Sequence, residues 1–168
     1  MNRLYFAYGS NLHPLRLAER APSSTLVGTT VLPAHALRFH KRSVDGSAKC
    51  DVVPDTAAVV YGALFELDAR GFDALSSAEE GYERVALNVQ AAGEPREAFT
   101  FRARPDRIAP GLTPYRWYRE LVMIGARFHA FPDDYVAALE RVAVAHDPDP
   151  VRAAAMDALG RRLRESLP

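Results

Sequence analysis

The feature that most constrains the fold is an apolar run at residues 57–67. It reads Ala-Ala-Val-Val-Tyr-Gly-Ala-Leu-Phe-Glu-Leu. A short, near-continuous run of this kind, bounded by polar residues, predicts a strand that is buried on both faces. Gly62 lies inside the run and indicates a bulge or a barrel bend at that point. We therefore expect this segment to form a strand in the interior of the protein.

The remaining segments predict strands first and helices afterwards. A helix over 68–78 interrupts the strands, with Asp68 as its N-cap, and Pro33 separates two of them. Predicted strands cover 3–8, 25–32, 35–40, 57–67, 83–91 and 96–103, and predicted late helices cover 114–127, 132–144 and 149–166. This order favours an α+β fold. We expect one domain, residues 1–168, with a small closed or nearly closed mixed β-barrel flanked by α-helices.

Composition excludes several classes of protein. The 21 Lys and Arg residues balance the 21 Asp and Glu residues, so no basic excess points to nucleic acid. The N-terminal residues lack an apolar signal core, and no stretch approaches the ~20 apolar residues that span a bilayer. The single cysteine, Cys50, cannot form an internal disulfide and is interpreted as a structural thiol. We expect a cytoplasmic protein that binds neither nucleic acid nor membrane.

The five histidines do not show metal-ligand spacing. No pair lies at i, i+4 beside an acidic residue. The sequence therefore predicts no metal site and no cofactor.

Two polar segments follow apolar ones and are candidates for a functional site. The first is residues 8–12, Tyr-Gly-Ser-Asn-Leu, directly after the first predicted strand. Gly9 allows close approach of backbone to a ligand, and successive N–H groups beside a helix start can hold an anion. An ordinary strand-to-helix turn, capped by Ser10 or Asn11, explains the same residues.

The second segment is Glu79-Glu80-Gly81-Tyr82. Two carboxylates at the C-terminal end of a helix oppose its dipole, and local rules are often broken at functional sites. A solvated helix end is the alternative interpretation.

Together these segments resemble the γ-glutamylcyclotransferase family. Residues 4–12 look like its signature loop, and the resemblance continues through 45–49, 60–67, 80–82, 118–126 and 131–135. The ordered matches run from about residue 4 to 147. Each match alone is weak, and their order makes them strong.

The resemblance implies a compact β-barrel with flanking helices and no cofactor. It also implies cyclisation of a γ-glutamyl group to 5-oxoproline with release of an amine. The substrate supplies its own nucleophile, the α-amino group, so the enzyme has to fold the glutamyl chain and move protons. The family's acid/base is the Glu directly before Gly, which is Glu80 here.

Helical periodicity gives a competing answer for the acid/base. Phe72, Leu75 and Glu79 share one stripe, so an unbroken helix turns Glu79 inward. We expect the helix to end before residue 80, which leaves Glu80 pointing into the barrel mouth and Glu79 on the surface.

The resemblance assigns substrate binding to Tyr8, Gly9, Ser10, Asn11, Leu12, Tyr82 and Tyr118. The two later tyrosines have an alternative role as packing residues. The sequence departs from the family at a shortened Gly81–Tyr82 region and at Phe101, where a tyrosine is expected. Lys49 and its basic neighbours could bind a carboxylate or form a solvated loop. The solvated loop is the favoured interpretation.

The predicted partner is therefore a small-molecule γ-glutamyl substrate, and the protein is expected to be a monomer or a homodimer. Two other functions stay open. One is removal of a γ-glutamyl group from a larger amine, and the other is ligand binding without catalysis on the same scaffold.

Overall fold

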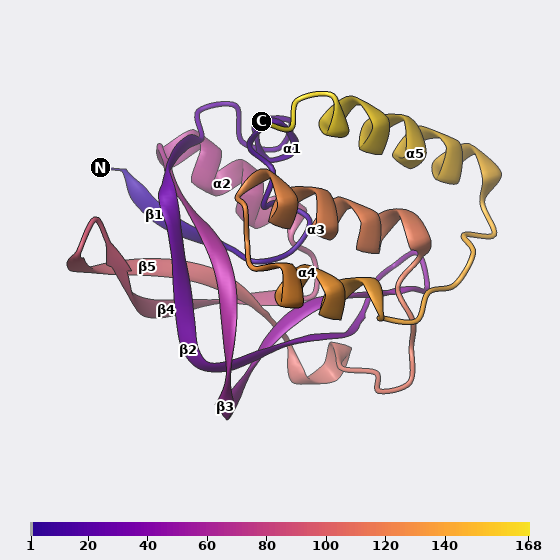
Figure 1. Cartoon of the computed structure of the whole chain (residues 1–168), viewed down its shortest axis with the longest axis horizontal. Coiled ribbons are helices and arrows are strands. Elements are labelled where there is room, and N and C mark those ends of the chain that lie inside the picture. The colour runs from indigo at the N-terminus through magenta and orange to yellow at the C-terminus, as the bar shows by residue number, and fades with distance from the viewer. Residues whose placement is uncertain (1) are drawn as a thin grey trace.

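The computed structural model describes residues 2–168 (Figure 1). The elements in chain order are β1 (Arg3–Ala7), α1 (Pro14–Ala18), β2 (Thr25–Arg42), β3 (Ala48–Leu67), α2 (Ala69–Ala78), β4 (Tyr82–Ala91), β5 (Glu94–Ala103), the short 3₁₀ helix η1 (Pro105–Arg107), α3 (Arg116–Phe128), α4 (Asp133–Glu140) and α5 (Pro150–Arg164). None of the helices in this part of the chain is long and apolar enough to cross a membrane.

The five strands form one mixed sheet in the order β2-β3-β1-β5-β4. Strand β1 pairs antiparallel with β3 and parallel with β5, so the N-terminal strand lies in the middle of the sheet. The β2–β3 and β4–β5 pairs are antiparallel hairpins. The α+β class predicted from the sequence is confirmed.

The expected closed barrel is not confirmed. The strand order ends at β2 and β4, and within residues 2–168 no ladder joins these two edges, although they approach each other. Strand β2 has register shifts at Leu26/Gly28, Pro33/His35 and Phe39/Lys41. Bulges bend a strand and interrupt its pairing, and Pro33 has no N–H to donate, so β2 is poorly suited to a second continuous ladder.

The predicted buried strand is the second half of β3. Val60, Ala63, Leu64 and Phe65 are buried, so both faces are covered at this end. Gly62 does not mark a bulge, because the ladder with β2 is regular there. A Cβ atom at Gly62 would lie 2.3 Å from the Phe6 ring, so the residue is needed for close packing.

The helices cover the sheet and complete the core. Figure 1 shows α3 between α4 and α5, and the C-terminus beside α1. One apolar cluster includes Phe6 of β1, Phe65 of β3, Leu75 of α2 and Ile124 of α3. The core therefore fixes the β1–α1 connection and the end of α2, which form the site described next.

Candidate active site

The loop at residues 8–12 joins β1 to α1, and contacts with the C-terminal end of α3 hold it in place. The Leu12 N–H donates to the Gly9 carbonyl at 3.1 Å, which closes a tight turn. The Leu12 carbonyl accepts a hydrogen bond from His129 Nε2 at 2.7 Å. A Cβ atom at Gly125 of α3 would lie 2.4 Å from Leu12 Cβ, so only glycine lets the loop seat this closely. Leu12 is thus buried as an anchor.

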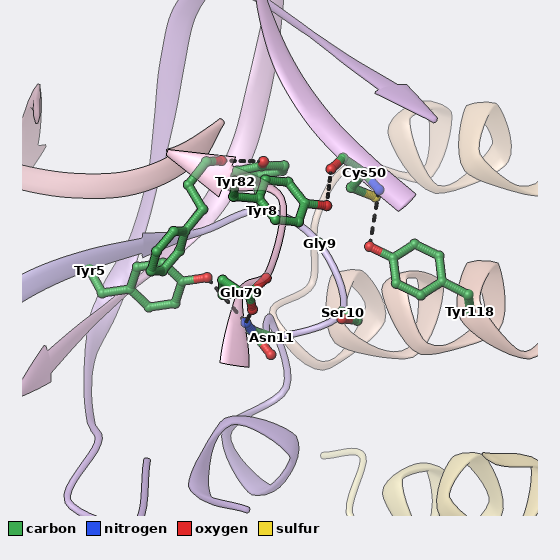
Figure 2. Close-up of a pocket in the computed structure, with 10 residues that line it drawn as sticks. Tyr5, Tyr8, Gly9, Ser10, Asn11, Cys50, Glu79, Tyr82 and Tyr118 are labelled. Atoms are coloured by element: carbon green, nitrogen blue, oxygen red, sulfur yellow. Dashed lines mark hydrogen bonds between the residues drawn. The ribbon is translucent and has the colours of Figure 1, made fainter. Parts of the chain in front are cut away.

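Above this anchor lies a small cavity (Figure 2). Its lining comes from β1, the 8–12 loop, β3, the end of α2, β4, β5 and α3. The lining residues are Tyr5, Tyr8, Gly9, Ser10, Asn11, Cys50, Glu79, Tyr82, Phe101 and Tyr118. Of the residues predicted from the sequence, the cavity brings together Tyr8, Gly9, Ser10, Asn11, Tyr82 and Tyr118. It leaves out Leu12 and Glu80.

The carboxylate at this cavity belongs to Glu79. Its Oε1 atom accepts hydrogen bonds from Asn11 Nδ2 at 2.9 Å and from Arg20 Nη1 at 2.9 Å. The Glu79 side chain is 13% exposed, whereas that of Glu80 is 66% exposed and lies 4.0 Å from Arg107. The predicted placement, with Glu80 inward and Glu79 at the surface, is therefore wrong.

The reason lies in the geometry of the helix end. Helix α2 does end at Ala78, before residue 80, as predicted. Glu79 follows it as the C-cap and stays on the buried stripe of Phe72 and Leu75. Gly81 then adopts a φ of +79°, a left-handed conformation that turns the chain into β4.

The tyrosines of the cavity are neutral hydrogen-bonding groups. Burial raises the pKa of Tyr8, Tyr82 and Tyr118 well above the ordinary range. Tyr8 donates to the Phe101 carbonyl at 2.5 Å, and Tyr82 donates to the Cys50 carbonyl at 2.7 Å. Tyr118 Oη instead accepts the Cys50 N–H at 3.0 Å. Because that bond uses an oxygen lone pair, the Tyr118 hydroxyl can still donate to a ligand.

Asn11 supplies an unused acceptor. Its Nδ2 donates to Glu79 and, at 3.3 Å, to Tyr5 Oη. Its buried Oδ1 has no hydrogen-bond partner among residues 2–168. Buried polar atoms are nearly always satisfied, so an unpaired acceptor in a cavity is a candidate contact for a donor on a ligand.

Sequence reasoning missed four residues at the site: Tyr5, Arg20, Cys50 and Glu79. The Phe72–Leu75–Glu79 stripe did carry a signal for Glu79. Tertiary packing brings the other three residues to the site. Cys50 only forms part of the cavity wall. Burial raises the pKa of its thiol to about 12, so the reactive thiolate is not favoured.

Comparison with known proteins finds a family whose sequences resemble part of this chain. Residues 59–139, which include Glu79 and Tyr118, match the sequence profile of the AIG2-like family. This segment of the chain therefore resembles the AIG2-like family. No curated protein matches the sequence.

Solved structures share the fold of this chain. One named gamma-glutamyl cyclotransferase has a TM-score of 0.84 and 18% identity, with 96% of this chain and 99% of that chain covered. An uncharacterized protein from Homo sapiens has a TM-score of 0.83 and 19% identity, with 95% and 98% covered. A yeast gamma-glutamyl cyclotransferase specific to glutathione has a TM-score of 0.57 and 12% identity, with 95% and 96% covered. At these identities the likeness establishes the γ-glutamylcyclotransferase-like fold.

Proposed function

We propose that this protein is a γ-glutamylcyclotransferase and that Glu79 is its general acid/base. The observation that carries the proposal is the position of Glu79. Its carboxylate is largely buried, borders the tyrosine-lined cavity and is held against the 8–12 loop by Asn11. The fold of the chain and its resemblance to the AIG2-like family support the same reaction class.

The proposed substrate lies with its γ-glutamyl group in the cavity. The unpaired Oδ1 of Asn11 accepts a hydrogen bond from the substrate's α-ammonium group, close to Glu79. Gly9 leaves room for the glutamyl chain, since a Cβ atom there would lie 3.2 Å from Cys50 Cβ and 3.5 Å from Tyr118 Oη. This arrangement folds the chain so that the α-nitrogen faces the γ-carbonyl carbon.

The reaction then needs proton transfer and no added water. Glu79 takes a proton from the α-ammonium, and the free amine attacks the γ-carbonyl carbon to form the ring C–N bond. The Tyr118 hydroxyl donates to the oxygen that becomes negative in the tetrahedral intermediate. Glu79 passes its proton to the departing nitrogen, and the original C–N bond breaks. The carboxylate of Glu79 then takes the second proton from the ring nitrogen and gives it to the free amine, which leaves as an ammonium ion. The products are 5-oxoproline and the free amine.

The test compares two neighbouring variants, Glu79→Gln and Glu80→Gln. Both remove one carboxylate from the same turn with almost no change in size. Glu79→Gln should reduce 5-oxoproline formation from γ-glutamyl dipeptides by about 10²–10⁴-fold, because an amide cannot shuttle the proton. Glu80→Gln should stay within a few-fold of the unmodified protein.

Chromatography of the products, with circular dichroism of both variants as a check of folding, decides between the two carboxylates. Loss of activity in Glu80→Gln with retention in Glu79→Gln would refute the assignment. Release of glutamate in place of 5-oxoproline would make water the nucleophile and would refute the cyclisation itself.

A further inference from the structure

A second cavity continues from the first beyond Glu79. The two share Ser10, Glu79, Tyr82 and Tyr118 in their walls. If the γ-glutamyl group fills the first cavity, the group attached to its amide nitrogen extends into the second. Nothing in the reaction itself specifies that leaving group, so the walls of the second cavity have to select it.

These walls carry three basic side chains beside the carboxylates of Glu79 and Glu80. Arg20, Lys41 and Lys49 all line the second cavity. Two of them are neutralised by close carboxylates, because Arg20 Nη1 lies 2.9 Å from Glu79 and Lys49 Nζ lies 2.7 Å from Asp45. The sequence had favoured a solvated basic loop here, and the structure instead turns both lysines toward a cavity.

Lys41 differs from the other two cations. It is only 5% exposed, and within residues 2–168 no carboxylate lies within 4.0 Å of its ammonium group. Its contacts are the Glu80 carbonyl, to which it donates at 2.5 Å, and the face of the Tyr82 ring, whose centroid is 4.5 Å away. Burial lowers the pKa of Lys41. The carboxylates of Glu79, Glu80 and Asp45 act on this ammonium group only from beyond ion-pair distance. A buried ammonium without a direct ion pair is costly, and a carboxylate from a ligand would offset that cost.

Lys41 also has a structural contact. A Cβ atom at Gly81 would lie 3.0 Å from Lys41 Cε and 3.2 Å from Nζ, so the side chain packs on the turn that carries Glu79 and Glu80. Loss of that contact should weaken every ligand alike. Loss of a charge contact should weaken only an anionic one, which separates the two roles.

We propose that the second cavity is the leaving-group subsite and that Lys41 makes it specific for a leaving amine that carries a carboxylate. The substrates are then γ-glutamyl amino acids or peptides, and γ-glutamyl derivatives of neutral amines are excluded. This inference rests on the proposed function for the direction in which the substrate lies.

Two ligand pairs test the inference. γ-Glutamyl-alanine and γ-glutamyl-alaninamide differ only in a carboxylate against a carboxamide, and they serve in a turnover assay. Glutaryl-alanine and glutaryl-alaninamide lack the α-amino nucleophile, so they cannot cyclise and serve in calorimetric binding. In the unmodified protein the acid should bind about tenfold or more tightly than the amide, as for a hydrogen bond between charged groups.

Lys41→Met should abolish this preference, because it should weaken the acid much more than the amide. Arg42→Met is the matched control, because it removes the same charge from the next residue, which is exposed and outside the cavity walls. It should keep the preference. Lys41→Arg retains a cation and should keep part of the preference. This variant provides the test if Lys41→Met folds poorly.

The possible results separate the inference from the proposed function. Equal affinity for the two glutaryl compounds in the unmodified protein, or no binding of either, overturns the carboxylate subsite. Equal weakening of acid and amide by Lys41→Met also overturns the carboxylate subsite. In that case the role of Lys41 is only to support the turn at Glu80 and Gly81. An acid preference that Lys41→Met removes supports the subsite even if no 5-oxoproline forms, and that lack of product would refute the cyclotransferase activity alone.

Discussion

His13 connects the loop of the candidate site to the acid stability of the protein. It is fully buried as the N-cap of α1, and its Nδ1 accepts a hydrogen bond from the Leu15 N–H at 3.2 Å. Ser166 Oγ donates to the Leu163 carbonyl, so its oxygen can accept from His13 Nε2, which is 3.1 Å away. Both contacts fit a neutral ring with its proton on Nε2. A second proton on Nδ1 would break the cap.

Burial, with the nearby His129 ring, lowers the pKa of His13 from 6.5 to about 4. As the pH falls from about 6.5, the unfolded chain takes up a proton at this position before the folded protein does. The free energy of unfolding therefore decreases between about pH 6.5 and pH 4, and it is unaffected by His13 above that range. At about 1.4 kcal/mol per pKa unit, the loss has an upper bound of about 3.5 kcal/mol, which solvent screening around α1 reduces.

Urea unfolding between pH 7.5 and pH 4.5, followed by Trp117 fluorescence, measures this loss. His13→Asn is the comparison, since asparagine is a good N-cap and cannot titrate here. The variant should be less stable at neutral pH because its smaller side chain leaves space beside Phe128, whose ring centroid lies 4.5 Å from that of His13. Its stability should nevertheless fall less steeply with acid. Parallel pH curves for the two proteins would refute the assignment.

Two further predictions concern the cavity walls. Gly9→Val should raise KM far more than Ser10→Ala, because a side chain at residue 9 would meet Cys50 Cβ at 3.2 Å and fill the space for substrate; steady-state kinetics of the two folded variants checks this, and a normal KM in Gly9→Val would remove the loop from the site. Cys50→Ser and treatment with EDTA should both leave turnover within a few-fold, because the nucleophile belongs to the substrate. Activity that EDTA abolishes and a divalent ion restores would contradict the mechanism.

Sequence patterns predicted the elements that depend on local chemistry. Asp68 caps α2 and accepts the Gly71 N–H at 2.7 Å, as its position before a helical stripe indicated. The β4–β5 hairpin turns at Ala92 and Gly93, both with positive φ, in the gap between the strands predicted at 83–91 and 96–103. In these places the sequence within a few residues determines the structure.

Elements that depend on distant partners were not predictable in the same way. Pro33 favoured two strands, yet β2 runs without a break from Thr25 to Arg42. Pairing with β3 along almost the whole length outweighs the local break, and the irregularity is absorbed at Ala34, which has a φ of 56°. The first half of β3 escaped prediction for a similar reason, since no strand was predicted for residues 48–56, which pair with the second half of β2.

The exchange of Glu79 and Glu80 combines both kinds of information. The local signal, the stripe of Phe72, Leu75 and Glu79, was correct, and the predicted helix end was correct as well. The local sequence did not show that Glu79, the first residue after α2, keeps the direction of this stripe although the helix has ended. Lys41 of β2 then donates to the Glu80 carbonyl, and Arg20 binds the Glu79 carboxylate. Contacts from residues 39 and 59 positions away thus hold Glu79 at the cavity, while the Glu80 side chain stays exposed. Lys41 therefore contacts the turn that carries Glu79 and also lines the second cavity. The proposed acid/base and the proposed leaving-group selectivity thus depend on the same turn.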